Sequence, residues 1–115
     1  MSDDDCLFCQ FVSGAIQPEV VHETDATLAF RDINPQAPTH VLVVTKEHHA
    51  NVAHLSADAP ETLVQLFESI RAVADSEGLG DRFRLVFNTG PEAGQSVFHV
   101  HAHLLGGRPM GWPPG

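Results

Sequence analysis

Positive charge is scarce in this sequence. Lys and Arg total 6 against 15 Asp and Glu, which gives a formal net charge of −9 at pH 7. A field of that sign repels a phosphate backbone, so we expect no bulk electrostatic binding to DNA or RNA. A small nucleotide stays compatible with this charge, because a few local hydrogen-bond donors can hold it.

Long apolar runs are also missing. No stretch approaches the ~20 residues that a membrane span needs, and the N-terminal segment lacks the apolar core of a secretory signal peptide. We therefore expect a cytoplasmic protein without a membrane partner. Cysteine is limited to Cys6 and Cys9, which in that compartment are thiols or metal ligands in preference to a disulfide.

The length of 115 residues suits a single domain over 1–115, short enough that a subunit partner would help to cover its apolar surface. One long helix is predicted over 60–77, with an apolar stripe at helical spacing. Local patterns predict a short helix over 6–13 capped by Asp5 and ended by Gly14, a hairpin over 20–22 and 27–30, and strands over 40–45, 83–88 and 97–105. Together they favour an α+β domain, with an antiparallel sheet of about five strands and its helices on one face.

Three of the eight histidines alternate in the last predicted strand. Alternation places His99, His101 and His103 on one face and apolar residues on the other. An ordinary solvent-facing strand would favour Lys, Glu and Thr, so we interpret the row as functional. Such histidines can bind a metal or act as nucleophile and acid–base groups near neutral pH.

A glycine-rich segment over 88–96 lies directly before the histidine row. Such a turn can offer backbone N–H groups, and Ser96 can offer a hydroxyl, to a phosphate group. Gly94-Gln95-Ser96 alone is typical of any turn. Its place beside the histidines favours a phosphate site.

The segment His99-Val-His-Ala-His-Leu-Leu105 resembles the signature of the histidine triad (HIT) superfamily. Other segments resemble its Hint branch, the purine nucleoside phosphoramidases: Cys6-Leu-Phe-Cys9, Leu28-Ala-Phe-Arg-Asp-Ile-Asn-Pro-Gln-Ala-Pro-Thr-His40, Gly94-Gln-Ser-Val97 and the tail that ends in Trp112-Pro-Pro-Gly115. Ala93 and Ala102 depart from the family pattern without removing a chemical group. The resemblance implies a HIT-like fold and a homodimer.

The resemblance also implies a reaction: hydrolysis of purine nucleoside 5′-phosphoramidates through a nucleotidyl-histidine, with release of AMP or GMP and no cofactor needed for catalysis. It makes His101 the nucleophile, puts His103 and Ser96 on the phosphate, and leaves His40 and His103 as candidates for moving the leaving-group proton. Phe30 and Ile33 would line the base pocket. The full set of nucleotide-binding residues that it implies is Phe30, Asp32, Ile33, Asn88, Gly94, Gln95, Ser96, His101, His103 and Trp112, with Asp32 on the ribose hydroxyls and Asn88 on the ribose–phosphate side.

The two cysteines lie in a Cys-x-x-Cys pair, which with two distant histidines can form a closed zinc site. His48 and His99 stand where zinc-binding relatives place theirs, so a structural zinc is expected. The alternative is a pair of buried thiols, since a thioredoxin-like redox pair lacks its βαβ context.

The tail over about 106–115 carries the single Trp, Trp112. The resemblance implies that it extends toward the active site of the dimer partner, and the alternative is a free end. Two other functions stay open, a dinucleoside polyphosphate hydrolase and a non-catalytic nucleotide-binding regulatory module. His22, His49 and His54 are expected at the surface.

Overall fold

The computed structural model describes residues 5–115, so residues 1–4 of the expected domain lie outside the described part. Its helices are α1 (Leu7–Ser13), α2 (Val52–Asp58), α3 (Pro60–Ser76) and the short 3-10 helix η2 (Pro91–Ala93). Its strands are β1 (Val20–Glu23), β2 (Thr27–Arg31), β3 (Thr39–Thr45), β4 (Phe83–Val86) and β5 (His101–Gly106). None of the helices within residues 5–115 is long and apolar enough to cross a membrane.

The five strands form one sheet in the order β1-β2-β3-β5-β4, and every neighbouring pair is antiparallel. β3 lies at the centre and is buried along its whole length, as its β-branched and apolar sequence predicts. The predicted α+β class and the five-stranded antiparallel sheet are therefore confirmed.

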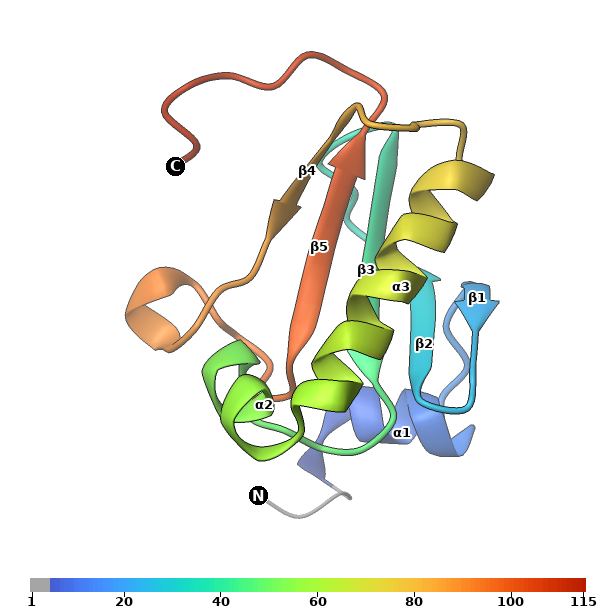
Figure 1. Cartoon of the computed structure of the whole chain (residues 1–115), viewed down its shortest axis with the longest axis vertical. Helices are drawn as coiled ribbons and strands as arrows, with labels where there is room; N and C mark the ends of the chain where they lie inside the picture. Colours follow the sequence, from blue (N-terminus) through green and yellow to red (C-terminus); the bar gives the residue numbers. More distant parts are fainter. Residues whose placement is uncertain (1–4) are drawn as a thin grey trace.

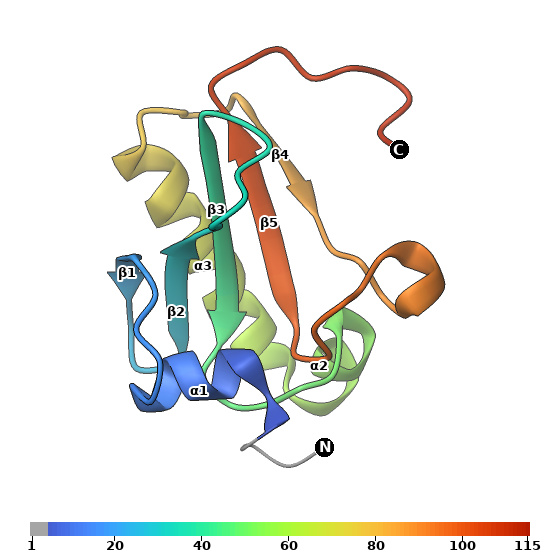
Figure 2. The same ribbon diagram turned by 180° about the vertical axis from the view of Figure 1, so that it is seen from behind.

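The two faces of the sheet carry different helices (Figures 1 and 2). Val41 and Val43 of β3 pack with α2 and α3 in the larger core cluster. Leu42 and Val44 point the other way, where Phe8 of α1 packs on them. The expectation that helices cover one face is wrong, because the apolar side chains of α1 need a buried surface of their own.

Helix α2 is absent from the sequence prediction. Its residues bury only Leu55, so the apolar periodicity is too short to detect. Its start does carry a signal, since the Asn51 side chain accepts a hydrogen bond from the His54 N–H at 2.9 Å, as a helix N-cap does. At α1 the N-cap is Cys6 and not Asp5, with the Cys6 Sγ accepting from the Cys9 N–H.

The last strand starts at His101, four residues later than predicted. The Val100 N–H donates to the His49 carbonyl at 2.7 Å, and the Gln95 side chain donates to the Val97 carbonyl at 3.1 Å. These bonds bend the chain ahead of β5. They also draw His49 into the interior, which corrects the expectation of a surface residue, whereas His54 is exposed as expected.

Candidate active site

A cleft of about 510 Å³ opens on the face of the sheet that carries α1. Among its lining residues are most of those that the sequence assigns to nucleotide binding: Phe30, Asp32, Ile33, Asn88, Gly94, Ser96, His101 and His103. Phe30 is buried at its base, whereas Ile33 is fully exposed. The cleft thus joins the end of β2, the loop after β4 and strand β5.

One hydrogen bond orients the His101 ring. Its Nδ1–H donates to the His99 carbonyl at 2.8 Å, so in the neutral ring the Nε2 atom carries the free lone pair. Phe8 packs edge-on against this ring with centroids 5.0 Å apart. His101 is 7% exposed, and its unprotonated nitrogen is the nucleophilic atom that the site offers.

His40 and His103 form a second pair beside it. The Gln36 backbone N–H donates to the His40 Nδ1 at 3.0 Å, so the proton of neutral His40 lies on Nε2. That Nε2–H donates to the His103 Nδ1 at 3.0 Å. His103 consequently carries its own proton on Nε2, the atom beyond this hydrogen bond. An Asp32 carboxylate oxygen lies 3.5 Å from the His40 Nε2 and faces the same pair.

The surroundings keep these rings neutral. Burial lowers the pKa of His40 and of His101 below the usual 6.5, and the Asp32 charge opposes that effect in both. Burial also lowers the pKa of His103, which with the neighbouring His101 and His40 falls to about 4. A neutral imidazole is the form that can attack phosphorus, so the site is poised for nucleophilic work at pH 7.

Internal hydrogen bonds stabilise the glycine-rich loop. The Gln95 side chain accepts from the Gly90 N–H at 2.9 Å and donates to the Ala50 carbonyl at 2.7 Å. The N–H groups of Gly94 and Gln95 donate to carbonyls of the same loop, to Pro91 at 3.1 Å and to Gly90 at 3.1 Å. In this conformation both amides thus have partners within the loop, and their contact with a phosphate stays a prediction. Ser96, which is exposed and lines the cleft, is the donor that the loop presents.

Trp112 lies away from this cleft. It is 85% exposed, and the tail runs outward beyond the end of β5 (Figure 1). The Arg84 side chain donates to the Gly111 carbonyl at 2.8 Å, and Arg108 donates to the Gln36 carbonyl at 2.9 Å, which fix the course of the tail. Within one chain, Trp112 contributes nothing to the cleft.

Two residues that the sequence did not single out shape the site. Phe8 packs on His101 and also on His99, with ring centroids 6.0 Å apart in the second pair. Its place between the two cysteines was the available signal. Arg31 directly precedes Asp32 and directs its side chain to Glu77 and Glu19, and a cation in a chain with few cations was the signal that could have found it.

The four predicted metal ligands lie together. One ligand atom from each of Cys6, Cys9, His48 and His99 falls within 4.8 Å of all the others. The His99 Nδ1 lies 3.3 Å from the Cys6 Sγ, 3.4 Å from the Cys9 Sγ and 3.2 Å from the His48 Nδ1. A tetrahedral zinc centre with its usual bond lengths separates sulfur and nitrogen by ~3.5 Å and two nitrogens by ~3.3 Å.

The hydrogen bonds around this cluster also suit a metal. The His99 Nε2–H donates to the Thr45 carbonyl at 2.7 Å, which leaves Nδ1 as the lone-pair atom toward the other ligands. Burial is the main reason that the pKa of His99 falls to about 4. The His99 Nδ1 thus offers its lone pair 3.2 Å from the His48 Nδ1 and beside two thiols, and this donor set fits zinc.

Comparison with known proteins places this geometry in a family. The model of the HIT domain matches residues 13–110. A HIT family hydrolase of Legionella pneumophila superposes with a TM-score of 0.92 at 47% identity, covering 96% of this chain and 100% of its own. The chain belongs to the HIT family, the nucleotide hydrolases and transferases that its histidine row resembles.

Two plant relatives carry more specific names. A 14 kDa zinc-binding protein of Zea mays is 44% identical over 117 residues, which cover 100% of this chain and 91% of the relative. The adenylylsulfatase HINT1 of Arabidopsis thaliana is 43% identical over 116 residues, which cover 99% of this chain and 79% of the relative. One name refers to zinc and the other to an adenylyl compound.

Proposed function

We propose that this protein hydrolyses purine nucleoside 5′-phosphoramidates, such as adenosine 5′-monophosphoramidate, with His101 as the covalent nucleophile. The observation that carries the proposal is that two histidines at the cleft differ in the state of their Nε2 atoms. The His101 Nε2 has a free lone pair, whereas the His103 Nε2 carries a proton. A binding module needs neither. This arrangement favours catalysis over a purely regulatory role.

The first step forms a bond between the His101 Nε2 and the α-phosphorus and breaks the P–N bond to the amine. The leaving amine takes a proton, for which the His103 Nε2–H is the donor. Solvent in the open cleft then restores the proton on the His103 Nε2, while the 3.0 Å hydrogen bond from the His40 Nε2–H to the His103 Nδ1 keeps the ring in place. The positive charge of this step forms on the His101 ring, which gains a bond at Nε2 and keeps its Nδ1–H, and the His99 carbonyl that accepts this N–H at 2.8 Å stabilises the charge.

The second step releases the nucleotide. Water attacks the phosphorus, the P–N bond to His101 breaks, and the proton of the water is released to solvent in the cleft. The products are AMP or GMP and the protonated amine, so atoms and charge balance without a redox partner. Ser96 would hold a phosphate oxygen through both steps, Asn88 would contact the ribose–phosphate side, and Asp32 would hold the ribose hydroxyls.

We further propose that Cys6, Cys9, His48 and His99 bind one structural zinc. The tetrahedral spacing of their ligand atoms supports this, as does the hydrogen bond from His99 to Thr45. When bound, zinc supplies a rigid crosslink between α1 and the chain ahead of β5. It takes no part in the reaction at phosphorus.

A panel of adenosine compounds tests the proposed reaction. Wild-type protein should release AMP from adenosine 5′-phosphoramidate, and His101→Ala should not. The panel should include diadenosine tetraphosphate, for the polyphosphate hydrolase alternative, and adenylyl sulfate, because the Arabidopsis relative is named an adenylylsulfatase. Faster turnover of either compound would reassign the leaving group and keep His101 as nucleophile. AMP binding without any turnover would favour the regulatory module.

A further inference from the structure

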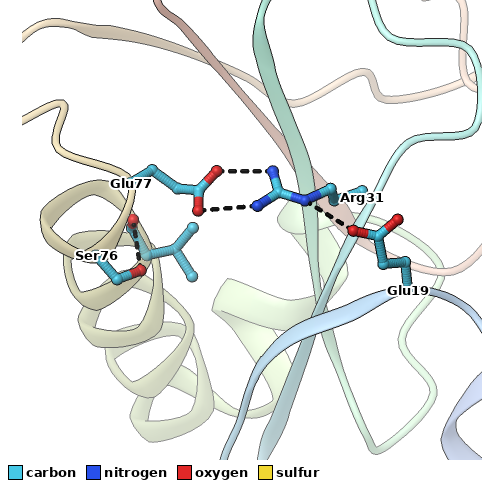
Figure 3. A network of polar contacts seen from close by, with 5 residues as sticks. Glu19, Arg31, Ser76 and Glu77 are labelled. Carbon is cyan, nitrogen blue, oxygen red and sulfur yellow. Dashed lines mark hydrogen bonds and ion pairs between the residues drawn. The ribbon is translucent and has the colours of Figure 1, made fainter.

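Arg31 joins three elements of the fold through its side chain (Figure 3). Its Nη1 and Nη2 donate to the two carboxylate oxygens of Glu77 at 2.7 and 3.0 Å, and its Nε donates to Glu19 at 3.1 Å. Its own backbone N–H also donates to the Glu19 carbonyl at 3.0 Å. Arg31 is the last residue of β2, Glu77 caps the end of α3, and Glu19 leads into β1.

The contacts of Arg31 lie next to two chain segments that line the cleft. Asp32 and Ile33 follow Arg31 in the chain, Gln17 and Pro18 precede Glu19, and all four line the cleft. Phe30 faces the α1 side of the sheet, so alternation turns the Arg31 side chain toward α3. Arg31 therefore connects both cleft-lining segments to α3, and it does so from the sheet face opposite the cleft.

The Glu77 contact is the stronger of the two ion pairs. The Glu77 side chain is 16% exposed and receives two parallel hydrogen bonds, whereas the Glu19 side chain is 74% exposed and receives one. Bidentate arginine–carboxylate pairs fix the relative orientation of the two side chains as well as adding stability, whereas exposed ion pairs contribute little to stability. Glu77 is thus the residue that holds the end of β2 in place, through its two hydrogen bonds with Arg31.

We propose that Arg31 and Glu77 form a positioning pair that holds Asp32 at the ribose side of the cleft and thereby sets the preference for ribonucleotides over 2′-deoxyribonucleotides. The pair does not touch the reacting atoms. It acts through the backbone that links Arg31 to Asp32, whose N–H is itself held by the His40 carbonyl at 3.0 Å. This inference rests on the proposed function for the assignment of the ribose to Asp32.

The test compares the affinities of AMP and 2′-deoxy-AMP, by calorimetry, in wild type, Arg31→Gln, Glu77→Gln and the double variant. Either single change should weaken AMP binding about tenfold, as expected when a charged hydrogen-bond acceptor is displaced and not removed. Binding of 2′-deoxy-AMP should change much less, because that ligand lacks one hydroxyl for Asp32. The double variant should be no worse than either single variant.

Kinetics supply a second readout. With the phosphoramidate substrate, KM should rise and kcat should stay within about twofold of wild type, since His101 is untouched. Arg31→Lys should recover part of the AMP preference. Lys46→Gln is the matched control: it breaks the 2.7 Å ion pair with Glu23 on the same sheet, away from Asp32, and should leave the preference unchanged.

The outcomes separate the inference from the proposed function. If wild type prefers AMP and Arg31→Gln loses stability but keeps that preference, the pair is only structural and the inference is overturned. If wild type binds both nucleotides equally, the ribose assignment to Asp32 fails, and the inference fails with it. If the preference is lost in Arg31→Gln and kept in Lys46→Gln, the pair is a positioning device.

Discussion

His99 belongs to two clusters at once. Its ring lies among Cys6, Cys9 and His48, and its backbone carbonyl accepts the hydrogen bond that orients the His101 ring. Phe8, between the two cysteines, packs on both of these histidine rings. A displacement of His99 would therefore also move the acceptor that points the His101 lone pair into the cleft.

The first prediction at the scale of single residues concerns removal of the nucleophile. His101→Ala should lower turnover of adenosine 5′-phosphoramidate by about 10⁴-fold or more, because the bond-forming atom is gone. AMP affinity should change far less, since Asp32 and Ile33 remain. Steady-state kinetics and calorimetry measure the two effects separately.

His103→Ala is the comparison for that variant and should cost less activity, because it removes a proton donor and not the nucleophile. His101→Gly should regain some turnover when imidazole is added, since the missing ring can then come from solution. Near-normal turnover in His101→Ala, or a trapped nucleotide on another histidine, would contradict the assignment.

The pH dependence of the rate follows from the lowered pKa of His101. Protonation of Nε2 removes the lone pair, so the rate falls as pH decreases through the pKa of the folded protein. Burial places that pKa below 6.5, so kcat/KM should be flat near pH 7 and lose half its value only below pH 6.5. A profile over pH 5–8 measures this, with circular dichroism at each pH to exclude unfolding. A midpoint above 6.5 would show that a different group limits the rate.

At the scale of elements, α1 stands apart from the other helices. It packs on the sheet face opposite α3, and its N-terminal turn supplies Cys6 and Cys9 to the four-residue cluster. His48 comes from the loop after β3, and His99 from the loop before β5. The cluster thus joins three segments that are distant in sequence.

Metal removal should therefore loosen α1. Protein purified without chelator should hold about one zinc per chain, and Cys6→Ser should lower the free energy of unfolding by about 2 kcal/mol or more, because ligand loss uncouples metal binding from folding. Elemental analysis and denaturant unfolding measure the two effects. Ala15→Ser, at an exposed position just beyond α1, is the control and should have little effect. Absence of zinc after reconstitution with excess metal would leave the cysteines as thiols.

At the scale of the whole molecule, apolar side chains gather on α3 and β4. Val64 and Phe67 of α3 are 60% and 45% exposed, and Phe83 of β4 is 37% exposed. β4 is also an edge strand, with unpaired backbone groups along one side. An exposed edge beside apolar side chains is typical of a surface that a second subunit covers.

We predict a symmetric homodimer through α3 and β4. Sedimentation equilibrium at micromolar concentration should give twice the mass of the chain, and Val64→Glu should shift the protein toward monomer. Ser56→Glu, on the exposed side of α2, is the charge-matched control and should stay dimeric. In the dimer the exposed Trp112 would approach the partner's cleft, so Trp112→Ala should raise KM without dissociating the dimer. A wild-type monomer under these conditions would contradict the prediction.

The sequence by itself determined the local structure and the reactive groups. The period of two in residues 101–104 places Ala102 and Leu104 on one face and His101 and His103 on the other, because alternation is a property of any strand. The continuous apolar run over 41–44 likewise indicates a strand that is buried on both faces. The apolar stripe and Pro60 likewise determined α3. Since these signals are contained in consecutive residues, they need no tertiary contact to be recognised.

Only the tertiary structure decided which groups meet. His40 reaches His103 because the register of β3 against β5 pairs His40 with Leu105 and Leu42 with His103. The bend before β5 and the inward turn of His49 depend on the hydrogen bond between the Val100 N–H and the His49 carbonyl, which joins two distant segments. A one-residue slip in register would reverse every facing side chain. The sequence thus contains the reactive groups and the local partners that orient His40 and His101, whereas the hydrogen bonds from His40 to His103 and from His99 to Thr45 join distant segments and are set by long-range packing.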